Sequence, residues 1–269
     1  MKPGICKMCL RSKDLVVSHL IPSALYEYLR MPDFKPVRVG NGVVMTSDRQ
    51  AQHPLLCFEC EDVLNQGGEL WMNSKLCTME RKFPLYSLLV QLPNILADED
   101  AALYYVPDSS IINFEKITHF GMGVFWKAAV HSWKGNEIDP LIDLGPYAHP
   151  IRQWLLGETN FPKDVQLWVS VSRPEHAQIT LNSPIRACRR DWTTYLWHAL
   201  GLMYQMNVGA GMDLPTRTSC FYRNPDHPIM VSTELTKDWE ARLASHYNES
   251  RKTRSFLEAT EKRFAKYRR

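Results

Sequence analysis

The stretch DVQLWVSVS, residues 164–172, carries the clearest alternation of side chains in the sequence. Val165, Leu167, Val169 and Val171 occupy every second position. A period of two predicts a strand with one buried face, so we expect a half-buried strand here. Two further apolar stretches, AQITL at 177–181 and LMYQMNVG at 202–209, are expected to be its partners in an antiparallel sheet.

Other segments follow helical or hairpin patterns. Residues 119–133 place Phe125, Ala128, Ala129 and Trp133 at helical spacing, and residues 147–157 predict a second short helix closed by Gly157. Nearer the N-terminus, residues 19–31 predict a helix begun by a proline. Residues 37–46 predict a hairpin that turns at 40–42. Helices and strands are therefore mixed along the chain.

These patterns predict an α+β fold in two parts without internal repeats. Residues 1–82 are expected to form a small N-terminal module, and residues 83–269 an α+β domain with an antiparallel sheet and a C-terminal helix. We expect that helix to run from Ser232 to the end of the chain. The histidines and tryptophans beyond residue 80, His131 and Trp133 among them, are expected to have core or surface roles rather than to bind metal or stack on bases.

Charge is concentrated at the C-terminal end. The whole chain has a formal net charge of only +3, yet residues 250–269 hold eight basic side chains against two acidic ones. Such a tail can neutralise phosphates without reading sequence, so we expect it to bind nucleic acid; a solvated, frayed tail is the alternative. The basic residues are Arg251, Lys252, Arg254, Lys262, Arg263, Lys266, Arg268 and Arg269.

The cysteines indicate a metal site in a reducing compartment. Seven cysteines are present, and four of them form two C-x-x-C pairs: Cys6 with Cys9, and Cys57 with Cys60. Four thiolates are a closed tetrahedral set for structural zinc, although residues 10–56 between the pairs are longer than the roughly 15 to 20 residues of compact zinc modules. Four buried thiols without metal are the alternative. With no apolar run long enough for a signal peptide or a membrane span, we expect a cytoplasmic protein and no membrane partner.

The motifs CKMC, SHLIP and QHPLLCFECEDVLNQGGELW together resemble the zinc-stabilised branch of the HNH endonucleases, the ββα-metal nucleases. In that branch a histidine followed by apolar residues and a proline lies between two C-x-x-C pairs. The later stretches FGMGVFWKAAVHSW, IDLGPYAHPIRQWLLGE and LMYQMNVGAG are similar to a group of bacterial HNH-like proteins of this length. The resemblance therefore implies a treble-clef zinc module at the N-terminus and extends over most of the chain.

The resemblance assigns roles to three residues. His19 matches the general base that takes a proton from the attacking water, a task suited to a group with a pKa near 6.5. Gln52 matches an asparagine that orients the imidazole. Glu61 matches a ligand of a catalytic cation, for which magnesium or manganese is suitable. The residue before the histidine departs from the pattern, because Ser18 stands where an acidic metal ligand is usual.

Asn65 is a second tentative ligand of that cation. The stretch EDVLNQ predicts a short helix, in which Glu61 and Asn65 are four residues apart and share one face, and Gly67 and Gly68 are expected to end it. Glu69 is a weaker candidate. The alternatives are a solvated helix end for these residues, and for His19 a structural histidine that bonds a backbone carbonyl or joins the zinc region.

The implied function is that of a metal-dependent endonuclease that hydrolyses phosphodiester bonds of DNA in prokaryotic defence or on mobile elements. The second hypothesis is a non-catalytic zinc module that recognises nucleic acid or a partner protein. Ser18 favours the module, and the joint presence of His19 and Glu61 favours the enzyme.

Overall fold

The structure, a computed structural model, describes residues 2–31, 34–40, 42–98, 100–106, 110–133, 141–189, 191–232 and 234–267. Its strands are β1 (Lys2–Ile5), β2 (Ser12–His19), β3 (Val37–Gly40), β4 (Val43–Thr46), β5 (Gln52–Cys57), β6 (Asn94–Ala97), β7 (Ala101–Tyr104), β8 (Val165–Val171), β9 (Ile185–Arg189), β10 (Thr193–Ala199), β11 (Leu202–Val208), β12 (Ile229–Ser232) and β13 (Arg251–Lys252). Its helices are α1 (Ser23–Glu27), α2 (Phe58–Leu64), α3 (Leu70–Asn73), α4 (Pro84–Leu89), α5 (Phe114–Val130), α6 (Ala148–Leu155), α7 (Leu214–Thr218), α8 (Glu234–Glu249) and α9 (Arg254–Tyr267). A π-helical turn, η1 (Asn65–Glu69), joins α2 to α3, and two 3-10 turns are η2 (Gly145–Tyr147) and η3 (Pro174–His176).

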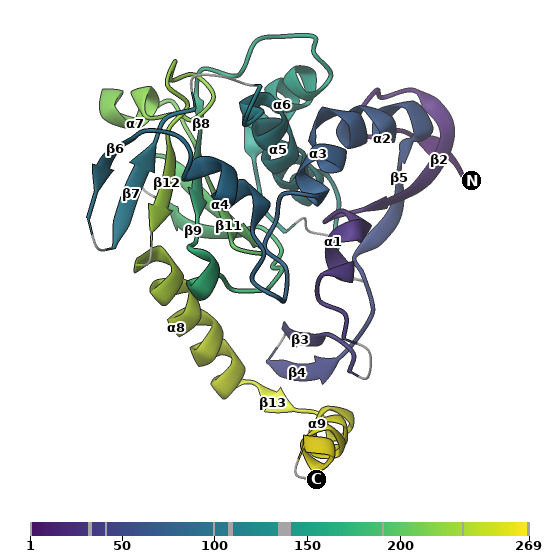
Figure 1. Ribbon diagram of the computed structural model, residues 1–269. Coiled ribbons are helices and arrows are strands. Elements are labelled where there is room, and N and C mark those ends of the chain that lie inside the picture. The colour runs from purple at the N-terminus through teal and green to yellow at the C-terminus, as the bar shows by residue number, and fades with distance from the viewer. Residues whose placement is uncertain are drawn as a thin grey trace.

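In the described part of the chain these elements form a mixed α+β structure with three sheets (Figure 1). Two of the sheets have three strands each, in the orders β1-β2-β5 and β13-β4-β3. The third has seven strands in the order β6-β7-β12-β8-β11-β10-β9. The expected class is confirmed at this level, and the boundary between residues 82 and 83 stays a prediction.

The first small sheet is continuous with a helix. β1 pairs with β2 and β2 pairs with β5, both antiparallel, and the chain passes from Cys57 at the end of β5 directly into α2. A register shift between Val16 and Val17 bends β2 before its last residues. His19 at the end of β2 therefore lies opposite Gln52 at the start of β5.

The large sheet differs from the expected antiparallel one. β12 pairs with β8 in parallel, and its other described pairs are antiparallel, so the sheet is mixed. The expected partner LMYQMNVG is confirmed as β11, but AQITL is not a strand beside β8 and makes only one isolated bridge, from Leu181 to Ala199. The prediction of a half-buried β8 is also wrong. Gln166 and Ser170 on its polar face are buried as well, while Trp168 on that face is exposed; the buried Gln166 amide oxygen accepts from Asn207 of β11.

Helix α5 crosses the large sheet and connects it to the cysteine-containing unit (Figure 1). Its apolar side packs on β10 and β11, where Phe120 contacts Trp197 and Tyr204, and the Tyr204 hydroxyl donates to the Ile117 carbonyl. Its other side packs against η1 and α3. The helix ends at Val130, so Trp133 lies beyond it rather than on the predicted helical face.

The glycine pair after α2 does not end the helix. The chain continues through η1 into α3, and a Cβ on Gly68 would lie 2.6 Å from both the Lys116 carbonyl oxygen and the Phe120 backbone nitrogen of α5. Gly68 allows the two backbones to approach closely, and a Cβ on Gly67 would meet the His119 ring, so these glycines serve packing rather than the end of a helix. The π-helical turn η1 lies at this contact with α5.

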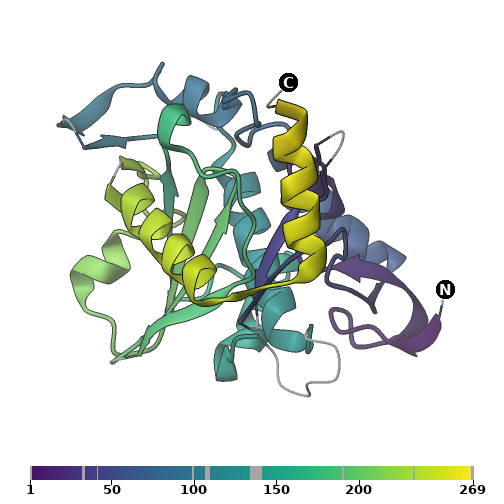
Figure 2. The same ribbon diagram turned by 90° about the horizontal axis from the view of Figure 1, so that it is seen from below.

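The C-terminal segment is two helices and not one. β13 separates α8 from α9 and pairs in parallel with β4, where the Arg251 amide donates to the Gly42 carbonyl and the Thr253 amide donates to the Val44 carbonyl. These bonds to the open edge of β4 replace helical ones. Helix α9 then packs on β4 and lies beside this hairpin in the view from below (Figure 2). None of the helices in the described ranges is long and apolar enough to cross a membrane.

Candidate functional site

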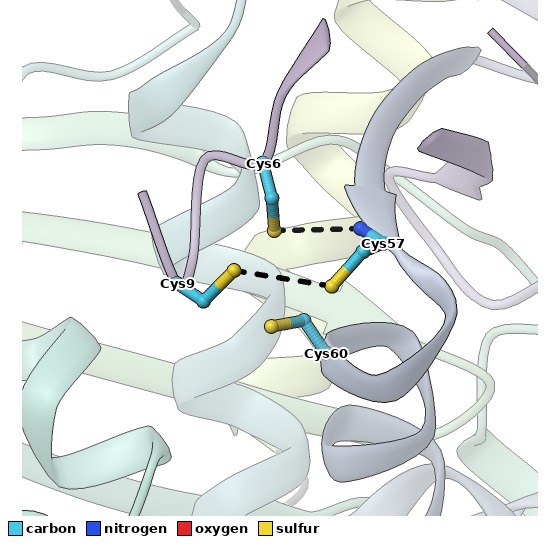
Figure 3. A group of neighbouring side chains, drawn as sticks. All are labelled: Cys6, Cys9, Cys57 and Cys60. Atoms are coloured by element: carbon cyan, nitrogen blue, oxygen red, sulfur yellow. Dashed lines mark hydrogen bonds between the residues drawn. The ribbon is translucent and has the colours of Figure 1, made fainter. Parts of the chain in front are cut away.

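The four cysteines of the two C-x-x-C pairs meet at one point (Figure 3). Cys6 and Cys9 lie in the turn between β1 and β2, Cys57 ends β5, and Cys60 lies in the first turn of α2. Their sulfur atoms are all within 4.8 Å of one another, and the Cys9 and Cys57 sulfurs are 3.9 Å apart. Ligand bonds of about 2.3 Å in a tetrahedral zinc site separate the sulfurs by about 3.8 Å. The cluster could therefore hold a metal ion such as zinc.

The turn between Cys6 and Cys9 aims both thiols at the cluster. Leu10 adopts a left-handed φ of 62°, and its amide donates to the Cys6 carbonyl over 2.9 Å. The Cys57 amide donates to the Cys6 sulfur over 3.3 Å, which fixes one pair against the other. Arg152 of α6 holds the outside of the turn, since its guanidinium donates to the Met8 carbonyl over 2.6 Å.

The thiols are held in a poorly solvated place. Burial raises the pKa of Cys57 to about 11, and burial also raises the pKa of Cys60, with the neighbouring thiols acting in the same direction. Cys6 differs, because burial raises its pKa but hydrogen bonds from the backbone of Cys57, Cys9 and Met8 outweigh burial and lower it. The neutral thiol is therefore favoured at Cys57 and Cys60 until a cation lies among the sulfurs. Metal binding would then release protons and contribute folding energy.

His19 and Gln52, register partners in β2 and β5, also touch through their side chains, because Gln52 is hydrogen-bonded to the half-buried His19 ring. Burial lowers the pKa of His19 and the charge of Lys127 lowers it further, whereas the Gln52 bond and the Glu69 carboxylate raise it. The net direction is downward. The ring is therefore neutral at neutral pH and has a nitrogen that can accept a proton.

Ser18 and Glu61 are joined in the same unit. The Ser18 side chain is fully buried and its hydroxyl donates to Glu61 Oε2 over 2.6 Å. Burial raises the pKa of Glu61, while the charge of Lys127 and the Ser18 bond oppose this and the Glu69 carboxylate adds to it. One carboxylate oxygen of Glu61 is thus already hydrogen-bonded to Ser18.

Asn65 stands apart from these pairs. It is half-buried at the start of η1, and among the described residues no hydrogen bond connects its side chain to His19, Gln52 or Glu61. The structure therefore brings His19 to Gln52 and Ser18 to Glu61, and leaves Asn65 outside.

A buried ion pair near these residues was not predicted from the sequence. Lys127 Nζ lies 2.9 Å from Glu69 Oε1, and the two side chains are 1% and 14% exposed. The charges of Lys127 and Glu69 both act on His19 and on Glu61. This ion pair therefore links the two parts of the polar site, His19 with Gln52 and Ser18 with Glu61. A signal was present, because Lys127 interrupts the apolar run GVFWKAAV, and a lysine within a buried helix needs a charged partner.

Three of the basic residues of the tail are occupied by local contacts. Lys252 caps α8, with Nζ donating to the carbonyls of Tyr247, Asn248 and Ser250 over 2.6, 3.2 and 2.9 Å. Arg254 pairs with Glu258 over 2.7 Å.

Arg263, the third of them, packs against the N-terminal module. Its guanidinium lies 5.0 Å from the ring centre of Phe34 and 2.8 Å from the sulfur of Met31. Phe256 of the same helix is buried, so the tail is docked rather than frayed.

Two basic side chains of the described tail are exposed without an ion pair, whereas the exposed Arg254 has Glu258. Arg251 and Lys262 are exposed and have no ion pair within the described ranges. The side chain of Lys266, and Arg268 and Arg269 as a whole, lie outside the described residues. Phosphate binding by this tail would therefore begin with Arg251 and Lys262.

No protein-family model matches this chain, and comparisons with curated proteins and with solved structures likewise find no match. The site is therefore interpreted from its own geometry.

Proposed function

We propose that this chain is a zinc-stabilised, metal-dependent endonuclease of the HNH type that hydrolyses phosphodiester bonds of DNA. The observation that carries the proposal is the unit β2–β5–α2, in which a half-buried histidine bonded to a glutamine lies in the same small unit as a four-cysteine cluster and a half-buried glutamate. The setting in prokaryotic defence or on mobile elements comes from the sequence resemblance alone.

In this proposal His19 takes the proton of the attacking water. The contact with Gln52 raises the pKa of His19, as expected for a group that stabilises the imidazolium; in the proposed mechanism the Gln52 amide oxygen accepts from one ring nitrogen and the other takes the proton. Burial and the ammonium of Lys127 keep the ring neutral before the reaction. Glu69 balances part of that positive charge, so the imidazolium that forms is not strongly opposed.

A catalytic magnesium or manganese ion would be held by Glu61, with Asn65 as a further oxygen ligand, and would stabilise the charge that develops on the scissile phosphate. This donor set fits only in part. Ser18 donates to one Glu61 oxygen, and Asn65 meets Glu61 through a backbone hydrogen bond rather than through its side chain in the described structure. Ser18 therefore competes with a cation for Glu61.

The test is cleavage of single- and double-stranded DNA with several divalent ions. His19→Ala should reduce turnover by about 10²- to 10⁴-fold, because positioned proton transfer is lost, while zinc content and folding stay intact. His176→Ala is the matched control, since His176 is an exposed histidine in η3. Equal cleavage by wild type and His19→Ala would overturn the enzymatic proposal.

A second function, a non-catalytic zinc module that recognises nucleic acid or a partner protein, is favoured by the bond between Ser18 and Glu61. Ser18→Asp separates the two functions. In an enzyme limited by metal binding, the added carboxylate should lower the magnesium or manganese concentration needed for half-maximal cleavage. Nucleic-acid binding without cleavage, in both wild type and Ser18→Asp with every ion, would favour the recognition module.

A further inference from the structure

Three aromatic side chains form a continuous ladder beside the polar site. The His53 and His131 rings are stacked, with centroids 4.1 Å apart and planes inclined by 30°. His131 meets Trp133 edge to face at 5.1 Å. Trp133 is fixed in turn, because its indole nitrogen donates to the Lys127 carbonyl over 2.8 Å. The ladder thus has a fixed inner end at Trp133 and an exposed outer ring, His53.

Both ends of the ladder are tied to the candidate site. His53 follows Gln52 in β5 and is the register partner of Ser18. At the other end, the carbonyl that anchors Trp133 belongs to Lys127, whose ammonium acts on His19 and Glu61. Because neighbouring side chains of a strand point to opposite faces, a group stacked on His53 would lie one residue along β5 from Gln52, on the strand face of Ser18.

The chemistry of the ladder suits a flat, uncharged ring. Burial lowers the pKa of His131, and the charges of His53 and Lys7 act in the same direction, so its imidazole is neutral at neutral pH. The neutral His131 ring is stacked on the exposed His53 ring. Nucleobases stack on such platforms whatever their sequence, because every base has a π-face.

We propose that the ladder of His53, His131 and Trp133 is a stacking subsite for one unpaired nucleobase of the substrate. The proposal rests on the proposed function for its substrate class, a nucleic acid. It adds that a nucleotide next to the cleaved bond is held by its base, which favours single-stranded or locally opened DNA over an intact duplex.

The test measures how the affinity for an oligonucleotide depends on its bases and on the ring of His53. Binding of a fluorescein-labelled thymidine oligonucleotide is compared with binding of an abasic sugar-phosphate chain of equal length, all in His19→Ala protein so that nothing is cut. The intact oligonucleotide should bind about 5- to 150-fold more tightly to protein with His53, since this is the range that one stacked base contributes. His53→Ala and His53→Leu should lose that difference, whereas His53→Phe should keep it. His176→Ala, an exposed histidine of η3, should leave it unchanged.

The outcomes separate the subsite from the enzyme. If the preference for bases is the same in His53→Ala, or if no oligonucleotide binds, the subsite is wrong. Cleavage that depends on His19 with affinity that ignores His53 would retain the enzyme and refute the ladder. Base-dependent binding through His53 without cleavage by wild type would retain the ladder and refute the enzyme.

Discussion

Lys127 Nζ lies 2.9 Å from Glu69 Oε1, and this ion pair joins α5 to η1 and acts electrostatically on His19 and Glu61. A buried charge without a partner is costly, so Lys127→Met alone should lower the free energy of unfolding by about 3 to 5 kcal/mol. Removal of both charges in Lys127→Met with Glu69→Leu should cost less than the first change alone. Denaturant unfolding of the two single variants and the double variant measures the difference. Additive losses would show that the pair is not coupled.

The two charges of this ion pair should shift the pKa of His19 in opposite directions. The charge of Lys127 lowers the pKa of His19 and the charge of Glu69 raises it. Lys127→Met should therefore raise that pKa, and Glu69→Gln should lower it. NMR titration of the His19 ring protons gives both values without an activity assay, and shifts of the same sign in both variants would contradict the arrangement.

Zinc should be bound once per chain and should support the N-terminal sheet. Cys60→Ser removes one of the four sulfurs and should lower zinc content by elemental analysis and unfold β1, β2 and β5, because metal binding energy here is folding energy. Cys77→Ala is the control, since Cys77 is also buried but is not in the cluster. Pure, folded wild-type protein without zinc would exclude the zinc site.

The exposed basic residues of the tail should contribute nonspecific phosphate contacts. Arg251→Gln with Lys262→Gln should flatten the slope of log affinity against log salt by up to about 2 for duplex DNA, roughly 0.9 for each phosphate that is no longer neutralised. Arg263→Gln, which removes the packing of a guanidinium on Phe34, should mainly lower stability. Deletion of residues 250–269 is a poorer test, because it also removes β13 from the edge of β4. An unchanged slope in the double variant would show that the tail does not bind phosphate.

Stability should fall as the solution is acidified, partly through His198. Burial lowers the pKa of His198 to about 3, whereas the unfolded side chain has a pKa of about 6.5. Between these values the unfolded state binds the extra proton. The stabilisation is therefore complete above about pH 6.5 and is lost as the pH falls toward 3, at up to about 1.4 kcal/mol per pH unit. His198→Gln should reduce this slope in urea unfolding across pH 4 to 6.

Sequence patterns predicted the local elements better than their surroundings. The hairpin at 37–46, the helix closed by Gly157 and the strand at 165–171 are all present, because each depends on nearby residues. The burial of Gln166 and the parallel partner β12 were not predicted, since both depend on strands distant in sequence. The cysteine cluster was predictable because the spacing within each C-x-x-C pair is a feature of the sequence. How the two pairs come together was not predictable, because 47 residues separate them.

Only part of the candidate polar site could be predicted from the sequence, for a related reason. His19, Gln52 and Glu61 lie close to the cysteine motifs, whereas Lys127 comes from a helix more than fifty residues later in the sequence. The glycines at 67 and 68 predict a helix end from sequence, because glycine is typical both of helix ends and of close contacts with another helix. Tertiary packing decides between the two.

The pairing of β13 with β4 has a consequence for the order of events during synthesis. The strand at 43–46 is synthesised about 205 residues before its partner at 251–252. At the usual 5 to 20 residues per second, the interval is roughly 10 to 40 seconds. During that time the edge of β4 in the nascent chain is unpaired, and other chains can add strands to such an edge. The edge of β4 is therefore protected against aggregation only after residues 251–252 have been synthesised.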